Sequence, residues 1–388
     1  MKTEVDVEPV IMDWVERYVQ TDKISSSLLD NFENWKAGKK KPTFNQLEKF
    51  SRATHVPLGY FFLRTPPVED LPLLKYRTID SLKLQNPSRD LIETIHDMEN
   101  IQDWMRNYLI TSEEARLDFV GSQRDHSVPG EIATQMRHDM GLNVDWFRKS
   151  KDASDSFKRI RTQAQALGIL VFMNGIVGNN TQRKLDIEEF RAFTLLDSYA
   201  PLIFINRNDS SNGMLFSLVH EMAHVWLGRD NFFNDRYSYA TGIDNVEVLC
   251  NAIAAEILVP HNTFIQQWRE KFHYDHEKII ASIAAYFRCG RTVIARKALT
   301  NDYIGIQEYK EIARDAIRHF DQLQGKRKEE ESGGNYYNTA ASRMDERFLD
   351  AIAGSIQEGK TLYSEAFRLT HTNRKTFSNL LIKIRGVE

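Results

Sequence analysis

Two histidines stand four residues apart in an apolar stretch that reads Phe216-Ser-Leu-Val-His220-Glu221-Met-Ala-His224-Val-Trp-Leu227. This spacing predicts a helix with both imidazoles on one face, where they can reach a single zinc ion at about 2.0–2.1 Å. Glu221 lies about 100° around that helix from His220, so its carboxylate can polarise a metal-bound water without coordinating the metal. The pattern is typical of a catalytic zinc site. The alternative is two histidines that only pack on a helix.

A catalytic zinc also needs a third protein ligand and one position left for water. Glu247 and Asn251 are four residues apart downstream and would share a helix face. We predict Glu247 as the third ligand and Asn251 as the acceptor of a ring N–H from one ligating histidine. Glu256 would point to the opposite side of that helix and is expected to be a solvated charge. Cys250 is expected to be a buried packing thiol.

Hydrolysis of a peptide also requires a hydrogen-bond donor for the developing oxyanion. Tyr237, Tyr239 and His261 are candidates because they lie near the histidine pair in the sequence. Nothing in the sequence chooses among the three.

The segments around these residues mix helical and strand periodicities, from about residue 129 to residue 305. They predict an α+β fold that is mostly helical, with a small sheet packed beside the helix of His220 and His224. The expected helices are Pro129 to Met140 and Ser154 to Leu167, and the expected strands are Ile169 to Met173, Phe193 to Leu196 and Leu202 to Ile205. The last strand is either an edge strand that could hold an extended peptide or a buried central strand.

The chain has 388 residues, enough for two or three domains. Prolines, glycines and charged stretches mark the expected domain boundaries. They divide the chain into a first helical domain, a helical connector, a catalytic domain with a helical extension, a flexible linker and a helical accessory module. Their boundaries are 1–80, 81–128, 129–324, 325–334 and 335–388 respectively.

Charge and composition exclude several classes of protein. Lys and Arg number 51 against 54 Asp and Glu, so the chain has no overall attraction for nucleic acid or anionic membrane. With two cysteines, a cysteine-based zinc site is excluded by count. No secretory pattern opens the sequence, and no apolar run reaches the roughly 18 residues of a membrane helix. We expect a cytoplasmic protein without a membrane partner.

Three segments in this order resemble the ImmA/IrrE family of bacterial metallopeptidases: Pro201-Leu-Ile-Phe-Ile-Asn206, Leu-Val-His220-Glu-Met-Ala-His224, and Glu247-x-x-Cys-Asn251-x-Ile-Ala-Ala-Glu-Ile-Leu-Val-Pro260. The resemblance implies a thermolysin-like zinc enzyme that cuts helix-turn-helix repressors and is often encoded by phages, mobile elements or stress-response loci. It implies His220, His224 and Glu247 as zinc ligands and Glu221 as the general base. Cys250 and Ile253 depart from the residues that the family usually has there.

The N-terminal residues from Trp35 to Thr43 and from Val56 to Leu63 resemble the later helices of phage-repressor-type helix-turn-helix domains. The first half of the domain lacks the glycine that often occupies the tight turn of this motif. Its basic loop either contacts DNA phosphates or is merely solvated, and it contains Lys36, Lys39, Lys40 and Lys41. We expect this domain to recognise protein more than DNA, with weak and salt-sensitive DNA binding.

Two further segments have features that nucleic-acid-binding proteins share. Residues Ile279 to Leu299 either form a helix-turn-helix or a helical layer that closes the catalytic core. The C-terminal tail carries a local excess of basic residues, and most such surfaces are only solvated. These residues are Lys360, Arg368, Arg374, Lys375, Lys383 and Arg385, against Glu365 and Glu388.

The sequence therefore predicts a zinc endopeptidase that cleaves a protein partner through a zinc-bound water activated by Glu221. The expected partner is a helix-turn-helix repressor or an antitoxin-like regulator. The alternative is a DNA-binding regulator or an interaction scaffold whose zinc is structural or sensory.

Overall fold

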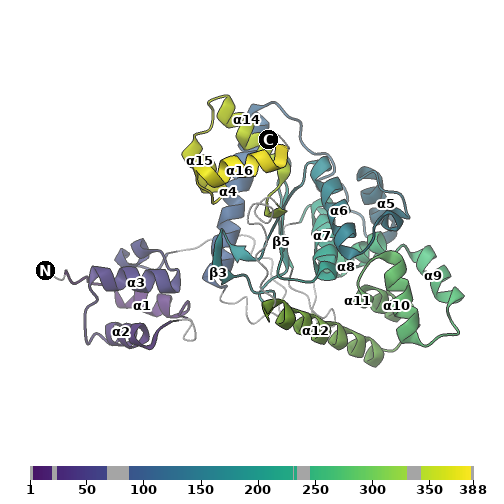
Figure 1. The fold of residues 1–388 in the computed structure, drawn as a ribbon, viewed down its shortest axis with the longest axis horizontal. Coiled ribbons are helices and arrows are strands. Elements are labelled where there is room, and N and C mark those ends of the chain that lie inside the picture. Colours follow the sequence, from purple (N-terminus) through teal and green to yellow (C-terminus); the bar gives the residue numbers. More distant parts are fainter. Residues whose placement is uncertain are drawn as a thin grey trace. The chain divides into compact units, whose positions relative to one another are not determined.

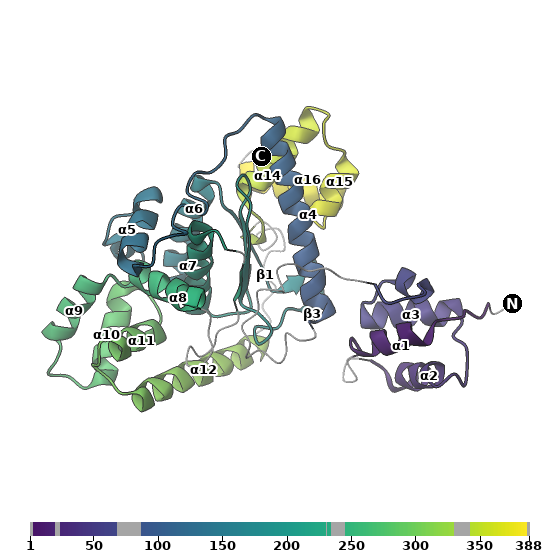
Figure 2. The same ribbon diagram turned by 180° about the vertical axis from the view of Figure 1, so that it is seen from behind.

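The computed structural model describes residues 3–19, 24–67, 87–229, 231–233, 245–329 and 342–385 (Figures 1 and 2). These residues form two compact units, one up to His96 and one from Asp97 on. The described chain is mostly helical with a small mixed sheet, which confirms the predicted α+β class.

The N-terminal unit is built from short helices around an aromatic core. Its helices are α1 (Pro9–Glu16), α2 (Ser26–Lys36), α3 (Phe44–Thr54) and the 3-10 helix η1 (Leu58–Phe62). Thr43 caps α3 through a capping box with Gln46, as expected for a threonine before an apolar helical pattern. Residues 37–43 join α2 to α3, and this connection is longer than the three to four residues of a helix-turn-helix turn.

A four-stranded sheet lies at the centre of the second unit, in the order β1-β5-β4-β6. Strands β1 (Leu170–Asn174) and β5 (Leu202–Asn206) are parallel, and β5 with β4 (Ala192–Leu195) and β4 with β6 (Asn231–Phe233) are antiparallel. Strand β5 pairs with β1 on one side and with β4 on the other, so the alternative of an edge strand at Leu202 to Ile205 is wrong, and all residues of β5 are buried. A strand with both faces covered is apolar throughout, as β5 is. A separate hairpin pairs β2 (Ile176–Val177) with β3 (Asn180–Lys184).

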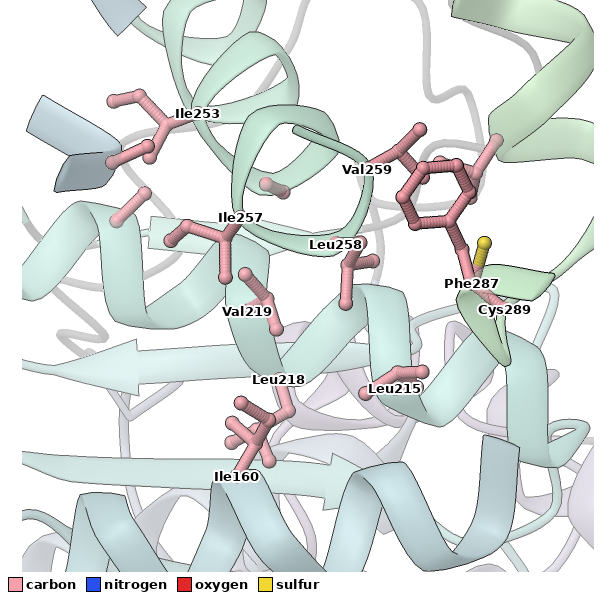
Figure 3. Packing of buried hydrophobic residues seen from close by; sticks show 14 of the residues in the cluster. Ile160, Leu215, Leu218, Val219, Ile253, Ile257, Leu258, Val259, Phe287 and Cys289 are labelled. Carbon is pink, nitrogen blue, oxygen red and sulfur yellow. The ribbon is translucent and has the colours of Figure 1, made fainter. Parts of the chain in front are cut away.

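Helices cover both faces of this sheet (Figures 1 and 2). On one face, α6 (Ala153–Leu167) and α7 (Ser211–Leu227) pack on alternate strand residues, with α5 (Pro129–Asp139) and α8 (Asn245–Leu258) outside them. Figure 3 shows α7 enclosed between Ile160 of α6 and the α8 residues Ile257 and Leu258. A helix packed on several sides can be apolar around most of its circumference, and α7 is buried throughout its second half.

The helices that follow α8 extend this core. They are α9 (His261–Glu270), α10 (His276–Phe287), α11 (Arg291–Thr300) and α12 (Ile306–Glu329), while the 3-10 helix η4 (Trp146–Lys149) precedes α6. Ile279, Phe287 and Ile294 belong to the same buried cluster as α7, so the segment Ile279 to Leu299 is a helical layer that closes the core. Helix α12 continues through residues 325–329 of the segment predicted as a linker.

The C-terminal helices α14 (Glu346–Gln357), α15 (Tyr363–Leu369) and α16 (Arg374–Arg385) are joined to the sheet by polar and aromatic contacts. The fully buried Asp345 accepts hydrogen bonds from the backbone N–H of Val171 at 2.9 Å and from Gln165 at 2.8 Å. Phe348 packs against Phe172 of β1 and Trp104 of α4 (Arg89–Thr111). Strand β1 pairs only with β5 among the described strands, so the N–H of Val171 on its other edge has no strand partner. Asp345 accepts the hydrogen bond from this N–H in place of a strand.

No single helix in the described ranges is long and apolar enough to cross a membrane. Helices α8 and α9 are long and apolar enough for a membrane span only when taken together, and a bend of 62° separates them.

Candidate metal centre

Helix α7 carries the two histidines and is fixed at both ends. Ser210 caps its first turn by accepting a hydrogen bond from the N–H of Gly213 at 2.9 Å. Gly228 ends the helix in the left-handed conformation, with φ of 65°. A Cβ at Gly228 would lie 2.9 Å from the Cα of Gly121, so the close approach of these two backbone segments requires glycine.

Three side chains converge on one point between α7 and α8. The Nε2 atoms of His220 and His224 are 3.1 Å apart, and the two carboxylate oxygens of Glu247 lie 3.3 Å and 3.4 Å from them. Four ligands at about 2.0–2.1 Å in tetrahedral geometry are separated from one another by about 3.3 Å. The separations are close to this value, so the two imidazole nitrogens and one oxygen of Glu247 could hold a metal ion. Both histidines are buried, while 13% of the Glu247 side chain is exposed to solvent.

Asn251 lies one turn after Glu247 on α8 and fixes the ring of His220. Its Oδ1 is 3.0 Å from His220 Nδ1, so the N–H of that nitrogen can donate to it. This tautomer leaves the lone pair of Nε2 for a metal. Burial holds the pKa of His224 well below its ordinary value, which favours the neutral form that metals bind.

Glu221 lies beside the cluster and is fully buried. Thr194 Oγ1 of β4 donates to Glu221 Oε2 at 2.6 Å, while Oε1 makes no hydrogen bond to any described residue. Burial raises the pKa of Glu221 to about 8, and the neighbouring Glu247 adds to this, whereas His220 and Thr194 lower it. A divalent cation in the adjacent site would favour the ionised carboxylate.

Thr194 was not identified from the sequence, although one signal pointed to it. The strand β4 reads Ala-Phe-Thr-Leu, and all its residues are buried. A polar side chain in a buried apolar strand needs a hydrogen-bond partner. The sequence does not say that this partner is Glu221, because the pairing of β4 with α7 is a tertiary contact.

The structure corrects the prediction for Glu256. This residue is not a solvated charge, because its Oε2 accepts a hydrogen bond from Lys297 Nζ at 2.6 Å and its side chain is 19% exposed. Its Oε1 accepts from the backbone N–H of His261 at 2.8 Å. Burial lowers the pKa of Lys297, and the ion pair with Glu256 opposes that shift. Cys250 is buried, as expected.

Of the three oxyanion candidates, only His261 belongs to the described residues. Tyr237 and Tyr239 lie outside the described residues. His261 is exposed at the start of α9, beyond the far end of α8 from Glu247. At 1.5 Å per residue, Glu247 and Leu258 are separated by about 16 Å along α8. The structure therefore does not bring His261 to the metal ligands.

The N-terminal lysines that were candidate DNA contacts differ in their surroundings. Lys36 donates to Glu16 at 2.7 Å, and Lys41 lies 2.5 Å from Asp6. Lys39 and Lys40 are exposed and form no ion pair within the described part of the chain. Two of the four charges are thus neutralised inside the unit itself.

Comparison with known proteins gives two matches to family models. Residues 164–299, which include α7 and α8, match an IrrE N-terminal-like domain of the peptidase family M78. Residues 344–383, which include α14 and α15, match a domain of unknown function, DUF8813. No curated protein and no solved structure matches the chain. The first match supports a relation to the ImmA/IrrE peptidases and a protease-type domain.

Proposed function

We propose that the protein is a zinc-dependent endopeptidase that cleaves a protein partner. The observation that carries this proposal is the combination of a three-ligand cluster with a separate buried carboxylate. His220, His224 and Glu247 lie close enough together to hold one metal ion, and Glu221 lies next to them without joining the set. Three protein ligands with an open position are the pattern of catalytic zinc, whereas structural zinc has four protein ligands.

The residues around this cluster can carry the proton transfers of peptide hydrolysis. A bound zinc would polarise the scissile carbonyl and the attacking water. Glu221 Oε1, which has no hydrogen-bond partner among the described residues, accepts the water proton and later returns it to the leaving amine. Thr194 holds Oε2 of the same carboxylate, so the carboxylate keeps one orientation through both transfers.

The edge of the sheet nearest to Glu221 offers a place for the substrate backbone. Thr194 of β4 pairs with Asn231 of β6, and β6 has no second strand partner among the described residues. An extended peptide that pairs with β6 would run beside the metal ligands. The proposed substrate class is a helix-turn-helix repressor or an antitoxin-like regulator, and the proposed compartment is the cytoplasm. Both follow from the resemblance to the ImmA/IrrE family, and the match of residues 164–299 supports the peptidase domain.

A structural or sensory zinc is the competing function. A site of that kind has no use for a general base, so a buried Glu221 beside the ligands would only destabilise the fold. In the described part of the chain, no fourth histidine, cysteine, aspartate or glutamate joins the three ligands. Both observations favour catalysis.

The proposal is tested by intact-mass analysis of candidate helix-turn-helix repressors incubated with the protein. We expect two fragments whose masses sum to the repressor plus one water. Cleavage should stop after chelation and return when zinc is added. Repressors that stay intact with the zinc-loaded protein, while the protein holds about one zinc per chain, would favour the structural or sensory function.

A further inference from the structure

The three C-terminal helices contain a shorter connection than the one between α2 and α3. Helices α15 and α16 are separated only by residues 370–373. Four residues is the turn length of a helix-turn-helix motif. The helices share a buried apolar core with α14, formed by Phe348, Leu349, Ile352, Ala366, Leu369, Phe377 and Leu380. Figure 1 shows the three helices gathered in one group.

The turn between α15 and α16 is held in place by the rest of the unit. His371 Nε2 lies 2.8 Å from Asp97 Oδ2 of α4, and its backbone carbonyl accepts a hydrogen bond from Asn179 at 2.5 Å. Asn373 caps α16 by accepting from the N–H of Thr376 at 3.0 Å. The two helices are therefore presented in a fixed arrangement, which reduces the entropy lost when they bind a partner.

The exposed side of these helices carries three basic residues beside the exposed apolar side chains of Tyr363 and Ile382. Arg368 on α15 and Arg374 and Lys375 on α16 are exposed, and the sequence from 366 to 385 contains no aspartate or glutamate. Within the residues that the structure describes, none of these three cations takes part in an ion pair, unlike Lys36 and Lys41. The positive charge of this surface is therefore available to a partner.

The position of two of these cations favours an anionic partner. Arg374 and Lys375 stand in the first turn of α16, at the positive end of the helix dipole. A cation is disfavoured at that end of a helix, whereas phosphate groups of a partner would interact favourably with both the cations and the helix dipole. Ser378, exposed one turn later, adds a short polar side chain to the same helix.

We propose that α15 and α16 form a helix-turn-helix that binds double-stranded DNA, with α16 in the major groove. In this geometry the first helix crosses the backbone and the N-terminal residues of the second contact phosphates and base edges. Arg374 and Lys375 would make these contacts. Duplex RNA fits less well, because its major groove is too narrow for a helix. A surface that binds another protein usually has few charged residues at its centre, so the exposed cations of α15 and α16 favour DNA over a protein partner. The proposal is independent of the peptidase function.

The test is fluorescence anisotropy of the full-length protein with a labelled duplex of about two to three helical turns, measured over a range of salt concentrations. For a duplex of arbitrary sequence we expect a Kd of about 10⁻⁶–10⁻⁴ M at physiological salt. The double variant Arg374→Gln, Lys375→Gln should bind more weakly. Its plot of log affinity against log salt should be shallower by about 1.8, since each lost phosphate contact removes about 0.9.

The matched control is Lys149→Gln, Lys151→Gln, which removes the same charge from exposed positions at η4 and just after it. This control should bind DNA like the wild type. The proposal is overturned if the wild type does not bind the duplex, if the control loses as much affinity as the α16 variant, or if a duplex RNA of the same sequence binds more tightly. The readout is DNA binding alone, so it does not depend on whether the protein cleaves a peptide.

Discussion

The metal centre and the N-terminal lysine loop both contain residues that the sequence singled out, but they differ in burial. His220, Glu221 and His224 are buried, and Asn251 and Thr194 fix two of them by hydrogen bonds. Lys36 and Lys41 instead form surface ion pairs within their own unit. Burying polar groups has a free-energy cost that surface charges do not carry. A buried cluster of this kind is therefore stronger evidence of function than a basic loop.

The largest expected effect is the loss of the metal ligands. The double variant His220→Ala, His224→Ala should lose zinc and cleavage together, because Glu247 alone cannot hold the ion. Metal analysis of the wild type should give about one zinc per chain, and the double variant close to none. If the variant kept its zinc content, the metal ligands would not be the two histidines of α7.

A smaller effect is expected at the residue that orients Glu221. Thr194→Val keeps the shape of the side chain but removes its hydrogen bond to a carboxylate, and such a bond is worth about 1.5–3 kcal/mol. We expect kcat to fall about 10- to 100-fold with zinc content and KM little changed. Thr194→Ser, which restores the hydroxyl, should recover most of the rate. If Val and Ser behave alike, the hydroxyl has no role in orienting Glu221.

The contact that covers the edge of β1 should affect stability rather than chemistry. Asp345→Ala removes the acceptor of the Val171 and Gln165 hydrogen bonds and the cap of α14. Leaving a buried N–H without a partner costs about 1–3 kcal/mol. Denaturant unfolding should show a loss of about 2–4 kcal/mol, with the remaining folded protein still binding zinc. A change below about 0.5 kcal/mol would mean that water replaces the carboxylate.

The smallest effect is expected in the lysine loop. Lys39→Gln, Lys40→Gln should change neither the unfolding midpoint nor cleavage, because both side chains are exposed and no described residue pairs with them. Thermal unfolding and the repressor cleavage assay measure this. A large loss of cleavage would show that the loop binds the substrate and would weaken the contrast with the metal centre.

Local periodicity made much of the site predictable. The histidine pair, Glu247 and Asn251 depend on the phase of single helices, which the sequence displays directly. The sequence does not predict the central position of β5, because strand order depends on pairing between distant segments. Glu256 was misassigned for the same reason, since its partner Lys297 lies 41 residues away. Thr194 and Asp345 act across 27 and 174 residues, beyond the reach of any local pattern.

The central claim is that Glu221 is a general base and not a zinc ligand. Glu221→Gln is nearly isosteric and should keep about one zinc per chain. General-base assistance is worth about 10²–10⁴-fold in rate, so cleavage should fall by that factor. Glu277→Gln, at an exposed position of α10, is the matched control and should cleave like the wild type. Zinc and cleavage are measured on the same preparation. Loss of zinc from Glu221→Gln, or cleavage at the wild-type rate, would contradict the account.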